Sequence, residues 1–139
     1  IIPTVITQLL DGKEKLKLGN LTPTRDLTFV LDTVAGFLNI YKSEKLYGEV
    51  TNIGMNTEIS VRDLIKLISD ILGKEVLIES EQERIRPSNS EVERLVCNNS
   101  KIMKHTEWKP KYNLEKGLKA TIDWLMNHIK LYKSDLYNV

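Results

Sequence analysis

A polar loop between two apolar segments carries the residues best suited to bind a ligand. Residues 83–95 read ERIRPSNSEVERL. The planar guanidinium of Arg86 suits a phosphate, and Pro87 holds the backbone beside it extended. Arg84, two residues away in an extended segment, would share that face. Glu91 could accept hydrogen bonds from both hydroxyls of a ribose. The loop therefore predicts a nucleotide-diphosphate site, and its alternative is a solvated loop whose charges pair among themselves.

A third arginine lies near the start of the chain, where an alternating apolar segment gives way to a turn. Residues 16–32 read LKLGNLTPTRDLTFVLD. The apolar alternation of Leu16 and Leu18 stops at Gly19–Asn20, and Arg25 stands between a turn and a hydrophobic run. Arg25 therefore stands at the edge of an apolar segment, as the loop arginines do.

Together the two segments resemble the C-terminal half of the extended short-chain dehydrogenase/reductase family, in particular its NAD-dependent nucleotide-sugar 4,6-dehydratases and epimerases. The pattern is similar to the GDP-mannose 4,6-dehydratase and bacterial-glycan dehydratase branches. The matching residues follow in the family's order: Leu18-Gly19-Asn20-Leu21, Arg25-Asp26, Val30, Asp32, Arg86-Pro87, Glu91-Val92, Ser100-Lys101, Trp108-Lys109-Pro110 and Leu114-Glu115-Lys116-Gly117-Leu118.

This resemblance implies an α/β fold, the C-terminal nucleotide-sugar-binding portion of an extended Rossmann-type protein with about five helices and several short strands. Residues 1–139 are expected to form that substrate-binding portion, and the N-terminal dinucleotide-binding domain is expected to be absent from the chain. The family's glycine-rich turn, Gly-x-x-Gly-x-x-Gly, does not occur in the sequence. We therefore expect NAD or NADP only in the full-length protein, which would be a homo-oligomer, and no catalytic or cofactor-binding residue here.

The resemblance also implies roles for individual residues. We expect Arg25 and Arg86 to bind the pyrophosphate, with Arg84 as a further candidate, and Glu91 to bind the ribose. Leu18 and Asn20 would lie near the base, although Asn20 could instead only close the turn. Asp26 is expected to make a structural bond, and Glu91 could pair with Arg84, Arg86 or Arg94 rather than with a ligand.

The function implied is binding of the nucleotide diphosphate of a GDP- or UDP-linked sugar, within a 4,6-dehydratase of surface-glycan sugar biosynthesis. Two alternatives stay open, a nucleotide-sugar 4-epimerase or reductase of the same family and a stand-alone binding domain without catalysis.

Composition narrows the class of protein. The chain has 139 residues, 41% of them hydrophobic and 28% charged, and a net charge of +1. This balance gives no reason to expect nucleic acid or a membrane as partner, and the cytoplasm is the expected compartment. The single cysteine, Cys97, is interpreted as a small core residue, and His105 and His128 are too isolated to predict a metal site.

Apolar periodicity predicts the elements that position these residues. Helices are expected from Pro3 to Asp11, from about Asp32 to Tyr41, from Ser60 to Gly73, from Asn99 to His105 and from Asn113 onward. Strands are expected at Lys15–Leu18, Glu49–Ile53, Glu75–Glu79 and Arg94–Cys97. Two details are specific: Val34, Phe37, Leu38 and Tyr41 should form a packed helix face, and Glu49–Ile53 should be buried.

Overall fold

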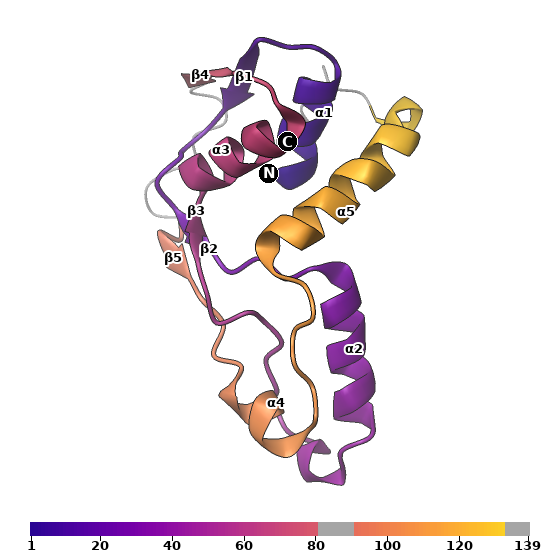
Figure 1. The fold of residues 1–139 in the computed structure, drawn as a ribbon. Coiled ribbons are helices and arrows are strands. Elements are labelled where there is room, and N and C mark those ends of the chain that lie inside the picture. Colours follow the sequence, from indigo (N-terminus) through magenta and orange to yellow (C-terminus); the bar gives the residue numbers. More distant parts are fainter. Residues whose placement is uncertain (81–90, 133–139) are drawn as a thin grey trace. The chain divides into compact units, whose positions relative to one another are not determined.

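The computed structural model describes residues 1–80 and 91–132. Figure 1 shows the ribbon, in which the chain divides into two compact units. Unit 1 comprises residues 1–23, 60–93 and 118–139, and unit 2 comprises residues 24–59 and 94–117. The predicted ligands Arg84 and Arg86 lie outside the described residues.

Unit 1 is built from helices and a two-stranded parallel sheet. Its helices are α1 (Ile2–Leu10), α3 (Val61–Leu72) and the part of α5 (Leu114–Asn127) from Leu118, followed by the 3-10 turn η3 (Ile129–Leu131). Strands β1 (Lys15–Leu18) and β4 (Leu77–Ser80) pair in parallel, with Leu16 opposite Ile78. The buried apolar residues of this unit are Val5, Ile6, Leu9, Leu16, Leu18, Leu64, Ile65, Ile68, Leu118, Ile122 and Leu125.

Helix α3 begins and ends as its sequence predicts. The Ser60 hydroxyl accepts a hydrogen bond from the Asp63 amide at 3.0 Å, which satisfies one free N–H of the first turn. Gly73 ends the helix in the left-handed conformation, with φ of 62°, where a side chain would be strained. The predicted helices α1 and α3 and the strand β1 are therefore confirmed, whereas β4 begins at Leu77, two residues later than expected.

Unit 2 holds the helices α2 (Val30–Tyr41) and α4 (Ser100–His105), the 3-10 turn η1 (Glu44–Leu46) and very short strands. Strand β2 (Thr24–Arg25) pairs in parallel with β5 (Arg94–Leu95), which is two residues shorter than predicted. The sheet order is β3-β2-β5, with β3 (Ile59–Ser60) at the boundary between the units. Because these strands are so short, most of the backbone of unit 2 is held by contacts between loops rather than by hydrogen bonds between strands.

The prediction for α2 was right about the helix and wrong about its buried face. Phe37 is 65% exposed and Tyr41 77% exposed, and Val34 and Leu38 are exposed as well. The inward side instead carries Asp32 and Gly36, the buried residues of this helix. A Cβ on Gly36 would lie 2.8 Å from the Ile53 side chain, so this side admits only small residues at that point. Helical spacing shows where an apolar face lies, but it does not show what covers that face. In the described chain the apolar stripe is uncovered.

The predicted buried strand at Glu49–Ile53 is not formed. These residues have no strand structure, and Val50 is 86% exposed. The segment is instead held at its start by Lys101, whose ammonium donates to the Glu49 carboxylate and the Val50 carbonyl, both at 2.8 Å. An apolar β-branched run becomes a strand only beside a partner, and the described residues provide none here.

A buried tryptophan joins the start of α2 to the loop that precedes α5. Trp108 is 2% exposed, and its indole N–H donates to the Asp32 carbonyl at 2.9 Å. The Asp32 carboxylate accepts the amide N–H groups of Lys111 and Tyr112 at 2.9 and 3.0 Å. The prediction that Trp108 serves packing is confirmed. Helix α2 begins at Val30, close to Asp32 as expected, and Asp32 itself is a buried acceptor.

Candidate functional site

Arg25, the described arginine of the predicted phosphate site, lies on β2 in unit 2. Its guanidinium donates to the Thr24 carbonyl at 2.8 Å, and the side chain is half-buried. It lines a cavity of about 40 Å³ together with Leu27, Met55, Thr57, Glu58, Ile59 and Leu114. That volume suits one or two water molecules rather than a nucleotide diphosphate. The cavity described beside Arg25 is therefore smaller than a nucleotide diphosphate needs.

The residue after Arg25 fixes the local backbone. The Asp26 carboxylate accepts three backbone N–H groups, from Met55 at 2.9 Å, Asn56 at 2.8 Å and Cys97 at 3.1 Å. Two loops distant in sequence are thereby held against the end of β2. The predicted structural role of Asp26 is confirmed, and the arrangement sets the position from which Arg25 extends.

Next to the Asp26 carboxylate, the backbone at Gly54 is packed too closely against Cys97 for a side chain to fit. A Cβ placed there would lie 2.3 Å from the Cys97 Cβ, so only glycine fits. The Gly54 carbonyl accepts the Asn99 side-chain amide at 2.8 Å in buried surroundings. Burial, assisted by the Asp26 charge, raises the pKa of the Cys97 thiol. The thiol therefore stays protonated at neutral pH and serves packing.

A carboxylate that the sequence did not reveal holds the pair of strands β2 and β5 together at their start. Glu58 accepts the Thr24 hydroxyl at 2.6 Å and two donors of the Arg94 guanidinium, with its shortest contact 2.7 Å. The hydrogen bonds from Arg94 lower the pKa of Glu58, and the pKa of Arg94 is raised in return. Arg94, considered as a partner of Glu91, thus forms an ion pair with Glu58. Their separation of 36 residues left no local signal for it.

The predicted base and ribose ligands belong to unit 1. Leu18 ends β1 with its side chain buried, so a ligand could reach only its backbone. The Asn20 side-chain oxygen accepts hydrogen bonds from the Thr22 amide at 3.1 Å and the Thr22 hydroxyl at 3.0 Å. These bonds close the turn, which is one of the two roles predicted for Asn20. Glu91 is half-buried and has an interaction partner. Leu18, Asn20 and Glu91 are thus brought into one unit, whereas Arg25 belongs to the other.

Two Tyr-x-x-x-Lys spacings occur in the chain, and neither forms a proton-transfer site. Tyr41 is an exposed residue at the end of α2, and Lys45 lies in the following 3-10 turn. The ammonium of Lys116 lies 4.6 Å from the centre of the Tyr112 ring, which also packs on Phe29 with ring centres 4.6 Å apart. The second pair is a cation–π contact on an aromatic packing cluster.

Neither a metal cluster nor a membrane span is found among the described residues. No group of three or more His, Cys, Asp or Glu side chains there could hold a metal ion. The His128 ring stacks on Trp124 with ring centres 4.2 Å apart, and its Nδ1 lies 2.7 Å from the Trp124 carbonyl. No helix in this part of the chain has the length and apolar content to cross a bilayer.

Known proteins resemble this chain in both sequence and structure. It is 32% identical to the human dTDP-D-glucose 4,6-dehydratase over 140 residues, 96% of this chain and 39% of that protein. The dTDP-glucose 4,6-dehydratase from Bacillus anthracis in complex with NAD matches with a TM-score of 0.77 and 29% identity, over 94% of this chain and 40% of that one. The UDP-glucuronic acid 4-epimerase from Bacillus cereus, in complex with UDP-glucuronic acid and NAD, matches with a TM-score of 0.79 and 28% identity over the same shares.

These matches cover nearly all of this chain but only part of each relative. The chain spans about two fifths of the length of the curated relatives, so it corresponds to one part of such proteins. The structural relatives are Rossmann-type extended short-chain dehydrogenases/reductases, which confirms the predicted fold class. The family model for GDP-mannose 4,6-dehydratase matches residues 1–121. This chain is therefore a member of the GDP-mannose 4,6-dehydratase family, among the nucleotide-sugar dehydratases and epimerases of the extended short-chain dehydrogenases/reductases.

Proposed function

We propose that this chain is the nucleotide-sugar-binding portion of an NAD(P)-dependent nucleotide-sugar 4,6-dehydratase. The observation that carries the proposal is the family match over residues 1–121, nearly the whole chain, while the relatives are more than twice as long. One relative named as a dehydratase was solved in complex with NAD. The share of the relatives that the chain matches corresponds to substrate binding, and the rest would bind the dinucleotide.

The exposed helix α2 supports this division of labour. Its apolar stripe runs through Val34, Phe37, Leu38 and Tyr41, on a helix whose opposite side is already packed. Exposed apolar stripes of this kind are typical of surfaces that another part of a protein covers. We assign the stripe to contact with the dinucleotide-binding part. The exposed segment 49–53 would gain a strand partner in the same step, which accounts for its apolar sequence.

Within the chain, binding would rest on the charged residues that the family pattern marks. Arg25 and Arg86 would bind the pyrophosphate and Glu91 the ribose, with Arg84 beside them. The Asp26 clamp supports the role of Arg25, because a backbone fixed by three hydrogen bonds positions the arginine in advance. Holding the reacting groups in place can lower a barrier by about 7–11 kcal/mol, so such anchors matter for turnover.

The cofactor itself would be bound elsewhere. NAD(P), when bound, accepts a hydride from a substrate and returns it. The residues of this chain do not fit it: the sequence has no Gly-x-x-Gly-x-x-Gly turn, and both Tyr-x-x-x-Lys pairs lie in packing or solvent positions. We assign no catalytic step to these residues. They bind and orient the sugar nucleotide.

The product distinguishes the dehydratase from its alternative in the same family. Relatives include a UDP-glucuronate 4-epimerase from Thermodesulfobacterium geofontis, 29% identical over 84% of this chain, so epimerisation is a specific second candidate. Incubation of the full-length protein and NAD with GDP-, UDP- and dTDP-linked hexoses would be followed by mass spectrometry for loss of water and by proton NMR for a change of configuration at C4. A dehydratase removes one water from the sugar, whereas an epimerase leaves the mass unchanged. Turnover without loss of water would refute the dehydratase assignment, and no turnover of any sugar would refute both.

A further inference from the structure

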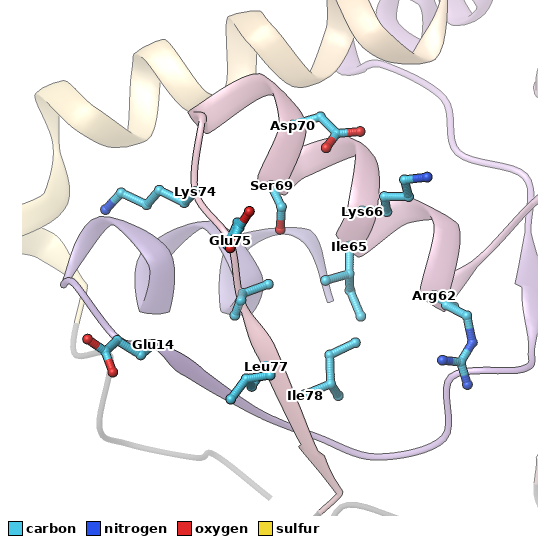
Figure 2. A pocket seen from close by; sticks show the side chains of 11 residues that line it. Glu14, Arg62, Ile65, Lys66, Ser69, Asp70, Lys74, Glu75, Leu77 and Ile78 are labelled. Atoms are coloured by element: carbon cyan, nitrogen blue, oxygen red, sulfur yellow. The ribbon is translucent and has the colours of Figure 1, made fainter.

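A groove in unit 1 runs along one side of the strand β4. It has a volume of about 770 Å³, within the range of ligand-binding pockets. Figure 2 shows side chains from α3 and from the segment leading into β4 around this space. All its lining residues belong to unit 1, none of them is a predicted nucleotide ligand, and the groove is thus separate from the site proposed above.

A buried hydroxyl in this groove lacks a hydrogen-bond partner. Ser69 is 7% exposed, and its Oγ makes no hydrogen bond within the described chain. In Figure 2 the hydroxyl points from α3 into the space beside β4. Because buried polar atoms are almost always paired, an unpaired one facing a groove indicates a position where a ligand atom would be bonded.

The free edge of β4 forms one wall of the groove. Leu77 and Ile78 of β4 and the two residues before the strand, Glu75 and Val76, line it, as expected where a groove follows the edge of an extended segment rather than one face. The Leu77 amide donates to the Glu14 carbonyl at 3.0 Å, on the β1 side. Successive residues turn their backbone groups to opposite edges, so Val76 and Ile78 present theirs away from β1. In the described chain β1 is the partner strand of β4, which leaves this edge open to another strand.

The charges along the groove are polarised. Arg62 lies near Ile78 in Figure 2, and Lys66, one helical turn further along α3, lies beside Asp70. The ion pairs found in the described chain involve neither of them. Glu75 and Glu14 lie toward the other end, together with Lys74, whose ammonium donates to the Leu9 carbonyl. An extended segment with a negative group at its end and a positive group upstream would match this pattern.

We propose that this groove binds the C-terminal end of an extended peptide, which adds to the free edge of β4 in the parallel direction. Its terminal carboxylate would lie between Arg62 and Lys66, and its backbone would bond to Val76 and Ile78. The Ser69 hydroxyl would bond to the peptide as well. Strand addition beside a helix gives affinity through backbone bonds, while the carboxylate sets the direction and the register.

The test uses isothermal titration of the intact protein with the free pentapeptide Lys-Ser-Val-Thr-Val and its C-terminally amidated form. The free peptide should bind, and amidation should weaken binding by about tenfold or more, since hydrogen bonds to a charged group are lost. Arg62→Gln and Lys66→Gln should each weaken the free peptide similarly, and the control Lys104→Gln, exposed on α4, should not. Ser69→Ala should fold normally and bind more weakly, because it removes no hydrogen bond of the free protein.

Hydrogen–deuterium exchange separates this mode of binding from its alternatives. The peptide should slow exchange in residues 75–80 and leave the nucleotide-dependent protection elsewhere unchanged. Equal affinity of the free and amidated peptides, or no binding at about 1 mM, would overturn the proposal. It would also be overturned if the amides of Val76 and Ile78, which face away from β1, were already protected in the free protein. A second copy would then be the occupant if protection required dimerisation, and another segment of the same chain if it did not.

Discussion

Replacing Asp26 by asparagine should destabilise the protein, because the carboxylate serves three backbone donors with two oxygens. Oδ2 accepts from Asn56 and Cys97, and Oδ1 accepts from Met55. An asparagine can place its one oxygen where two donors converge, but its NH2 group then faces the Met55 amide, donor against donor. One bond is lost and two lose their charge assistance, which predicts a loss of about 2–4 kcal/mol in the free energy of unfolding.

Urea denaturation followed by circular dichroism would measure that loss. With a slope of about 1–3 kcal/mol/M, the midpoint for Asp26→Asn should fall by about 1–2 M. The matched control is Asp123→Asn, an exposed position on α5 where the change should stay within about 0.5 kcal/mol. Equal midpoints for the wild type and Asp26→Asn would refute the view that this carboxylate holds the two loops.

Three further substitutions test other contacts of unit 2. Gly54→Ala should cost about 1–3 kcal/mol in thermal melts through overpacking, and the second change Cys97→Gly should restore part of it; an unchanged melting temperature would contradict the close contact. Arg94→Gln should change the free energy of unfolding little at neutral pH, because the ion pair is exposed. That small effect should vanish as the pH falls through the lowered pKa of Glu58, below which the carboxyl is protonated in both variants. A loss of stability that persists in acid would contradict this account of the pair. Trp108→Phe should cost about 1–3 kcal/mol by leaving a buried carbonyl unpaired, and unfolding at the wild-type urea midpoint would argue against that bond.

Local signals in the sequence predicted local structure well. The serine cap and glycine end of α3 and the alternation in β1 need only neighbouring residues, and both are present. The recurring family motifs likewise identified the family before any fold was known, since motif order is a property of the sequence itself. The prediction that Asp26 bonds structurally is confirmed for the same reason, because it rested on the motif around Arg25.

The predictions that failed depended on partners that a sequence pattern does not name. The apolar stripe of α2 and the segment 49–53 were predicted to be buried, but the stripe is exposed and Val50 is 86% exposed in the described chain. Glu58 was missed because its partner Arg94 is 36 residues away. Periodicity shows which side of an element is apolar, whereas burial is decided by whichever part of the protein lies against it.

The most direct test of the proposed function measures nucleotide binding by the full-length protein. Isothermal titration with GDP and UDP would compare the wild type with Arg25→Gln and Arg86→Gln, using Arg62→Gln as a matched arginine control outside the proposed nucleotide site. Each of the first two changes should weaken binding by roughly tenfold or more, equivalent to about 1.5–3 kcal/mol, and the control should not.

Glu91→Gln extends the same titration to the ribose. It should weaken binding of a ribonucleotide and leave a dideoxyribose analogue nearly unchanged, which separates ribose recognition from phosphate recognition. The account predicts weaker nucleotide binding when either Arg25 or Arg86 is replaced. Nucleotide affinity equal to the wild type in both arginine variants would contradict it.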